Sequence, residues 1–227
     1  MYFDMTYLVL VMPAVLLAML ASSRVNSTFK KYSTQYSRRR ITGADAARTV
    51  LDRNGLRDVR IERISGNLTD HYDPRSNVIR LSDNVYASTS TAAIGVACHE
   101  AGHAVQYAVN YTPIRLRAAI IPITNIGSQL AMPLVLLGLI LNFTNLAYLG
   151  IACFGLSTVF QLLTLPTEFN ASHRAVASIE GMELLRGDEL EGTKKVLRAA
   201  ALTYVAALAV TLMQLLRFIL IVGNRRD

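Results

Sequence analysis

Long apolar runs alternate with polar segments along this chain, and the runs predict four membrane-spanning helices. The first run, "MTYLVLVMPAVLLAMLA", covers residues 5–21. Two further runs cover residues 118–141 and 146–165, and the last covers residues 199–222. A helix needs roughly 20 apolar residues to cross the hydrocarbon core, so the first run is near the lower limit. The leading "MYFD" has no basic residue, which favours an uncleaved anchor over a cleaved signal peptide.

The segments between these runs predict a small polar portion with helices and strands. A helix begins at Thr42 and ends at the Asn-Gly pair of residues 54–55. "VRIERIS", residues 59–65, alternates like a strand, and a turn separates it from a second strand at residues 77–81. A longer helix covers about residues 90–109. The basic segment before this portion, residues 22–40, fits either an amphipathic helix on the membrane surface or a flexible linker.

These patterns predict a mainly α-helical membrane protein with four transmembrane helices and a small cytoplasmic α+β portion, which contains a short β-hairpin. We expect an N-terminal transmembrane anchor (1–23), a cytoplasmic α+β segment (24–117), a transmembrane helical hairpin (118–165), a cytoplasmic helical segment beginning at Pro166 (166–198), and a C-terminal transmembrane helix with its tail (199–227).

Composition and charge agree with a membrane protein and suggest its orientation. The chain has 227 residues, of which 52% are hydrophobic and only 17% charged. Of its 23 Lys and Arg, 15 lie in residues 24–117 and five in 174–198, whereas the 142–145 loop has none. The positive-inside rule therefore places both basic segments in the cytoplasm and both termini outside, with the terminal "NRRD" as a mild exception. The net charge of +7 does not imply nucleic-acid binding, since no such motif is visible.

The stretch "ACHEAGHAVQ", residues 97–106, carries the candidate chemistry. His99 and His103 are four positions apart, so on a helix they share a face and can bind one zinc ion. Glu100 lies about 100° around the helix, where it can take the proton of a zinc-activated water. The alternative is a pair of buried, hydrogen-bonded histidines. Cys98 points away from His99 on the helix and is expected to be a small packing residue. The chain has only one other cysteine, Cys153, so a four-cysteine zinc site is excluded.

A catalytic zinc site needs a third protein ligand, and Glu168 in "LPTEFNASHRA" is the best candidate. The 118–165 hairpin leaves the cytoplasmic face and returns to it, which brings Glu168 to the side of the histidine motif. His71 and His173 are the remaining histidines. The alternative for Glu168 is an acid near a helix N-terminus, favoured by the helix dipole.

Residues 71–106, the following hairpin and "LPTEFNASHRA" together resemble the YugP-type bacterial membrane zinc metallopeptidases, a family similar to the HtpX and CAAX-type membrane proteases. The resemblance covers nearly the whole chain. It implies a gluzincin arrangement, in which one zinc ion is bound by His99, His103 and Glu168 while Glu100 is the general base. This chain departs from the family pattern at Asn170, where Asp is usual, and that change affects how a ligand is oriented from outside the metal site.

The sequence therefore predicts a zinc-dependent endopeptidase of the bacterial plasma membrane, which cleaves membrane or membrane-associated polypeptides at the cytoplasmic face. The strand at residues 77–81 is either an edge that binds substrate or an ordinary structural strand. The chain is expected to contact the lipid bilayer. Assembly as a homo-oligomer or with an accessory membrane subunit is a separate expectation. The alternatives are a non-catalytic zinc-containing scaffold or chaperone and a narrow-specificity processing protease. Candidate oxyanion-stabilising residues are His71, Tyr72, Tyr107, His173 and Arg174.

Overall fold

The computed structural model describes residues 5–224, and the chain divides into two compact units. The helical unit comprises the residues up to Ser22, Pro113–Pro166 and the residues from Leu202 onward. The mixed unit comprises Ser23–Thr112 and Thr167–Ala201. The leading "MYFD" and the "RRD" of the C-terminal tail, on which part of the orientation prediction depends, lie outside the described residues.

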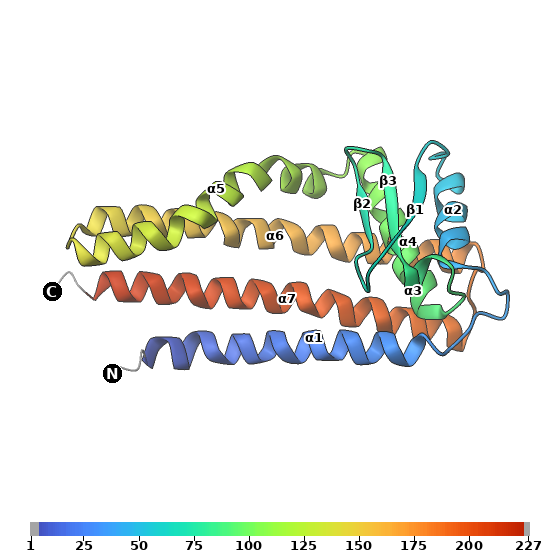
Figure 1. Ribbon diagram of the computed structural model, residues 1–227, viewed down its shortest axis with the longest axis horizontal. Coiled ribbons are helices and arrows are strands. Elements are labelled where there is room, and N and C mark those ends of the chain that lie inside the picture. Colours follow the sequence, from blue (N-terminus) through green and yellow to red (C-terminus); the bar gives the residue numbers. More distant parts are fainter. Residues whose placement is uncertain (1–4, 225–227) are drawn as a thin grey trace. The chain divides into compact units, whose positions relative to one another are not determined.

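Among the described residues, four helices are long and apolar enough to cross a membrane. They are the N-terminal helix Tyr7–Tyr32, made of a π-helical turn η1 (Tyr7–Val11) and α1 (Met12–Tyr32), then α5 (Thr112–Ile140), α6 (Thr144–Gly181) and α7 (Asp188–Gly223) (Figure 1). The predicted mainly α-helical membrane protein with four transmembrane helices is thereby confirmed. Each helix contains one of the four apolar runs.

The helical unit is held together by close packing of small residues. At Gly150 of α6, an added Cβ would lie 2.6 Å from the backbone nitrogen of Val135 in α5. The two helices therefore approach backbone to backbone, as small residues allow in membrane bundles. Many apolar side chains instead point outward, for example Leu20 and Ile140, which are 68% and 73% exposed. Such an apolar exterior suits contact with lipid rather than water.

Three prolines lie inside the membrane helices without ending them. Pro122 and Pro133 lie inside α5, and Pro166 lies inside α6. The predicted start of a new helix at Pro166 is therefore wrong, because α6 continues for 15 residues beyond it to Gly181. Proline removes one backbone hydrogen bond, a loss that neighbouring groups compensate in membrane helices. Glu168 consequently lies within a long helix, and the helix-dipole explanation for it fails.

The mixed unit contains a three-stranded sheet beside the histidine helix (Figure 1). Thr42 and Asp45 form a capping box at the start of its first helix. Strand order is β1-β3-β2, with β1 parallel and β2 antiparallel to β3. The elements are α2 (Gly43–Arg53), β1 (Arg60–Ile64), β2 (His71–Asp73), β3 (Val78–Ser82), α3 (Asp83–Tyr86) and α4 (Thr91–Ala108).

The expected edge strand at residues 77–81 is instead the central strand, so its prediction as a substrate-binding edge is wrong. β3 lies between β1 and β2. Its residues Val78, Ile79 and Leu81 have no exposed surface, and Ile79 and Leu81 belong to the core that includes residues of α2 and α4. The free antiparallel edge belongs to β2, a strand of three residues that the sequence pattern did not indicate. A short hairpin does precede the histidine helix, but β2 and β3 form it. The two strands predicted from the pattern, residues 59–65 and 77–81, pair in parallel as β1 and β3 and are not a hairpin.

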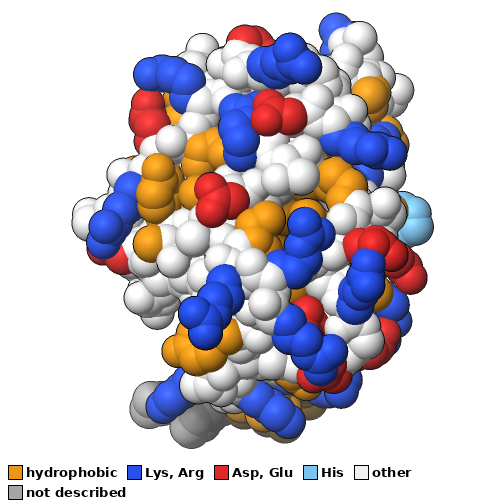
Figure 2. All heavy atoms as spheres, turned by 90° about the vertical axis from the view of Figure 1, so that its right-hand side faces the viewer, with side chains coloured by type: hydrophobic (Ala, Val, Ile, Leu, Met, Phe, Trp, Pro, Cys, Tyr) orange, Lys and Arg blue, Asp and Glu red, His pale blue; other side chains and the backbone are white. Residues whose placement is uncertain are grey.

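The basic segment after the first apolar run continues α1 as far as Tyr32, so the flexible-linker interpretation is wrong for residues 22–32. Phe29 is 8% exposed and belongs to the core of the mixed unit. Its helix face therefore packs against protein. Figure 2 shows Lys and Arg side chains spread over the face in view, with Asp and Glu among them. The mixed unit contains paired surface charges such as the Arg63–Asp83 and Arg38–Asp188 ion pairs.

Candidate metal centre

Helix α4 places the two motif histidines on one face. The helix begins after Ser90, whose hydroxyl accepts a hydrogen bond from the Ala93 amide at 3.2 Å. The imidazole rings of His99 and His103 lie 4.7 Å apart between centroids, at an angle of 84°. The small residue between them is needed, because a Cβ at Gly102 would lie 2.8 Å from the backbone oxygen of Ala171 in α6. The absence of a side chain at residue 102 thus lets α4 pack closely against α6.

Glu168 of α6 points its carboxylate at both histidines. Its Oε2 atom lies 3.2 Å from His99 Nε2 and 3.5 Å from His103 Nε2. Among residues 5–224, these three side chains form the group that could hold a metal ion, with ligand atoms all within 4.8 Å of one another. The other histidines are elsewhere: His71 and His173 are exposed and do not belong to this group.

The donor set and its electrostatics fit a zinc ion. Two imidazole nitrogens and one carboxylate oxygen are a typical catalytic zinc set, with a fourth position left for water. Glu168 is only 4% exposed, and a buried carboxylate requires a compensating positive charge. Burial disfavours protonation of His103, yet the hydrogen bond that its ring donates to the Glu168 carboxylate and the charge of Glu100 raise its pKa overall. A site that draws a proton in this way also favours a metal cation.

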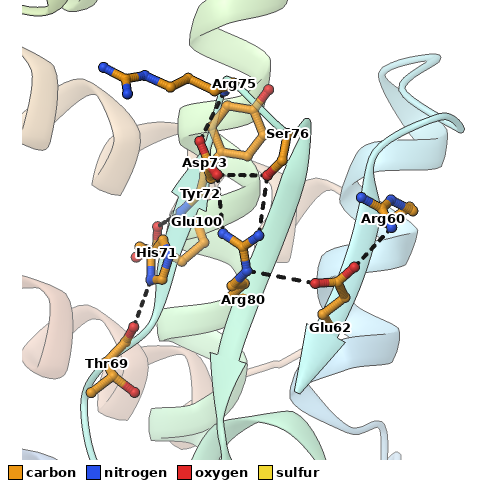
Figure 3. A network of polar contacts seen from close by, with 10 residues as sticks. All are labelled: Arg60, Glu62, Thr69, His71, Tyr72, Asp73, Arg75, Ser76, Arg80 and Glu100. Atoms are coloured by element: carbon orange, nitrogen blue, oxygen red, sulfur yellow. Dashed lines mark hydrogen bonds and ion pairs between the residues drawn. The ribbon is translucent and has the colours of Figure 1, made fainter. Parts of the chain in front are cut away.

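Glu100 is oriented by the backbone of β2. Its side chain is 8% exposed, and its Oε2 accepts a hydrogen bond of 3.0 Å from the Tyr72 backbone N–H (Figure 3). Backbone groups in an antiparallel strand alternate between the partner strand and the opposite side. Because the Tyr72 N–H points to Glu100, it does not point to β3. The free edge of β2 therefore faces the Glu100 carboxylate.

A ladder of charges crosses the sheet and holds β2 in this position (Figure 3). Arg80 of β3 pairs with Asp73 of β2 at 3.1 Å and with Glu62 of β1 at 3.6 Å. Hydrogen bonds from the Ser76 hydroxyl, the Arg75 amide and the Arg80 guanidinium hold the pKa of Asp73 below its ordinary range. Asp73 is thus a carboxylate at neutral pH, and its ion pair with Arg80 anchors the edge strand.

Two polar residues next to the histidines were not found from the sequence. Ser172 Oγ lies 3.1 Å from His99 Nδ1, and Gln106 Oε1 lies 2.9 Å from His103 Nδ1. Gln106 follows His103 by three positions on the same helix, a spacing that could have indicated the contact. Asn170, expected to act from outside the metal site, contacts Gln106 rather than a ligand.

Cys98 has no exposed surface, and burial raises the pKa of its thiol to about 12. It is a packing residue, as its helical position predicted.

Comparison with known proteins agrees with this site. Residues 7–223 match the family described as "Putative neutral zinc metallopeptidase". The chain is 48% identical over 223 residues to the "Putative membrane protease YugP" of Bacillus subtilis (strain 168), which covers 98% of this chain and 99% of that protein. No solved structure shows a significant match.

Proposed function

Because the chain belongs to this zinc metallopeptidase family, we propose that it is a zinc-dependent endopeptidase acting on membrane or membrane-associated proteins. One zinc ion per chain would be held by His99, His103 and Glu168. The single observation that carries the proposal is the convergence of these three side chains, with Glu100 beside them on the same helix. A purely structural site gains nothing from a neighbouring buried carboxylate, whereas hydrolysis needs a base.

In the proposed reaction, a bound zinc ion supplies Lewis acidity and makes water a better nucleophile. Glu100 takes a proton from the attacking water as its oxygen bonds to the peptide carbonyl carbon. The carbon–nitrogen bond then breaks, and Glu100 passes the proton to the departing amine. The Tyr72 N–H holds the Glu100 carboxylate in place and leaves its second oxygen free for this transfer.

The free edge of β2 is the proposed substrate strand. An extended peptide can pair with an exposed strand edge through backbone hydrogen bonds. On the β2 edge the Tyr72 N–H already donates to Glu100, so the Tyr72 carbonyl is the group that would accept from a substrate N–H there. Backbone pairing does not require a chain terminus, which supports cleavage within a polypeptide. The residue that stabilises the oxyanion stays a prediction, with the candidates His71, Tyr72, Tyr107, His173 and Arg174.

The proposed site faces the cytoplasm of a bacterial plasma membrane, with both termini outside. The support is the distribution of charge, since 15 of 23 Lys and Arg lie in residues 24–117. The segment boundaries set out from the sequence, and association with another copy or with an accessory subunit, also stay predictions.

The Glu100→Gln variant tests the proposal. The amide keeps the size and polarity of the side chain but cannot take a proton, so we expect one zinc per chain and at least about a 10²-fold loss of cleavage. Zinc content and hydrolysis of a generic unfolded protein are measured on detergent-purified protein. Glu180→Gln, at an exposed position of α6, is the matched control. Membrane-protein fragments are then compared between cells carrying wild type and Glu100→Gln.

Each outcome decides between the alternatives. A zinc-loaded Glu100→Gln variant that cleaves like wild type contradicts the assignment of the base. Wild type that binds zinc but cleaves no protein in either assay supports the scaffold or chaperone alternative. Fragments from one or very few proteins, without hydrolysis of unfolded protein, support a narrow-specificity processing protease.

A further inference from the structure

We infer that Tyr72 of β2 and Tyr107 of α4 select substrates that carry a large apolar residue immediately before the bond to be cleaved. The inference rests on the proposed endopeptidase function and deepens it, because it specifies which peptide bonds are cleaved. The two rings contact each other, with centroids 5.7 Å apart and planes at 56°. Both residues are only part-buried, so each keeps surface that a substrate side chain can contact.

Tyr107 lies on the face of α4 that carries the proposed metal ligands. It follows His103 by four positions, as His103 follows His99, so the three side chains stack one turn apart. A helical turn rises about 5.4 Å, and consecutive residues of an extended peptide are about 3.3 Å apart. Tyr107 therefore lies within the length of one or two substrate residues of His103.

The Tyr72 ring lies on the core side of the sheet. Tyr72 is paired with Ile79 of β3, and paired residues direct their side chains to the same face. Ile79 belongs to the core of the mixed unit, and Tyr72 packs against that core. The neighbouring Asp73 points to the opposite face, where Arg80 pairs with both Asp73 and Glu62 (Figure 3). One face of the β2 edge is therefore aromatic and the other is charged.

The hydrogen bonds of the β2 edge determine which substrate residue meets the Tyr72 ring. In an antiparallel pair, the arrangement that β2 already has with β3, two opposite residues can exchange both backbone hydrogen bonds. On the free edge, however, the Tyr72 N–H already donates to Glu100 at 3.0 Å. A substrate residue opposite Tyr72 can donate its N–H to the Tyr72 carbonyl, while its own carbonyl lies beside the Glu100 carboxylate. The carbonyl beside the base is the one to be attacked, so this residue precedes the scissile bond.

The side chain of that substrate residue lies on the same face as the Tyr72 ring. Cβ atoms of directly opposite residues are about 4.5–5.5 Å apart, which is within reach of an aromatic ring. The Tyr72 hydroxyl donates to Asn77 Oδ1 at 2.9 Å, so the ring rather than the hydroxyl is offered to the substrate. A large apolar side chain gains most from burial against two rings, whereas a charged one would lose hydration. The substrate residues before and after it point to the charged face and can be polar.

Cleavage of short peptides that differ at one central position tests the inference on zinc-loaded, detergent-purified protein. Mass spectrometry should show cleavage on the C-terminal side of Leu or Phe, with kcat/KM at least about 10-fold higher than for Ala or Asp at that position. Tyr107→Ala should reduce the Leu-to-Ala ratio about 2- to 5-fold, whereas Tyr107→Phe should keep it. Tyr86→Ala, at another part-buried tyrosine packed against the same core, is the matched control and should not change the ratio.

A second variant covers the case in which Tyr107→Ala does not fold. Tyr107→Arg keeps a long side chain that can lie over the Tyr72 ring and adds a positive charge, so cleavage after Glu should rise relative to cleavage after Leu. Three results would each overturn the inference. They are cleavage without preference at this position, cleavage before rather than after the apolar residue, and the same ratios in wild type and both Tyr107 variants.

Peptide binding separates this inference from the proposed function. Fluorescence anisotropy of the same peptides, labelled at one end, is measured on zinc-loaded Glu100→Gln protein. The Leu peptide should bind more tightly than the Asp peptide, and adding Tyr107→Ala should reduce the difference. A wild-type protein that cleaves no peptide contradicts the proposed function, whereas equal binding of the two peptides contradicts the role of the tyrosines.

Discussion

Gly102→Ala should weaken zinc binding at the proposed site although residue 102 is not one of the proposed ligands. The added Cβ would lie 2.8 Å from the Ala171 backbone oxygen, whereas ordinary contact begins at 3.4 Å. Relief of this overlap requires α4 and α6 to move apart by about 0.6 Å, since the obstructing atom belongs to the backbone of a helix. Overpacking of this kind costs about 1–3 kcal/mol of folding free energy.

The effect on the metal site follows from the position of Gly102 between His99 and His103. These two proposed ligands lie on α4 and the third, Glu168, lies on α6, so the same displacement separates His99 and His103 from Glu168. Metal–ligand distances tolerate about 0.2 Å, which is less than the shift that the methyl group requires. We therefore expect zinc affinity to fall together with thermal stability.

The assay combines chelator competition for zinc with the midpoint of thermal unfolding. Gly181→Ala is the matched control, because an added Cβ at Gly181 meets no atom within 4 Å. It should leave both quantities close to wild type. A Gly102→Ala protein that binds zinc with wild-type affinity and unfolds at the wild-type temperature would refute the reasoning.

Three further predictions concern single side chains or backbone groups. Glu168→Ala should lose zinc, as measured by metal content, and a variant that keeps one zinc per chain must use another third ligand. Tyr72→Pro removes the N–H that orients Glu100 and should lower cleavage about 10- to 100-fold with zinc retained, whereas Tyr72→Phe keeps that N–H and should cleave far better than Tyr72→Pro. The pKa of Cys98 is raised to about 12 in the fold from an ordinary 9.0, so the unfolded chain loses its thiol proton first as pH rises. The free energy of unfolding should therefore fall above pH ~9, by at most about 1.4 kcal/mol per pH unit. Denaturant unfolding at several pH values should show a smaller fall for Cys98→Ala than for wild type. An equal dependence of the unfolding free energy on pH in both proteins would contradict this prediction.

The sequence by itself determined the features that depend on local periodicity. The apolar runs predicted four membrane helices, because length and hydropathy decide which segments can cross a bilayer. The helical spacing of His99 and His103 predicted that they share a face. The place of Glu168 near the histidines could also be predicted from the sequence, since a hairpin with two membrane crossings returns the chain to the face it left.

Only the tertiary structure decided how separate segments meet. The alternating pattern of a strand does not specify its neighbours, so the sequence could not show that β3 is central and that the β2 edge faces Glu100. Pro166 predicted a helix end, but α6 continues through it to Gly181, because a proline removes only one backbone hydrogen bond of a long helix.

The surroundings of the ligands are the clearest case. Gln106 and Thr167 are 61 positions apart, and their hydrogen bond exists only because Gly102 lets α4 approach the backbone of α6. The sequence supplied the atoms that can bind zinc, since the residue types and their helical spacing are local properties. Packing decided their orientation, because hydrogen bonds between distant segments form only once the helices are in contact.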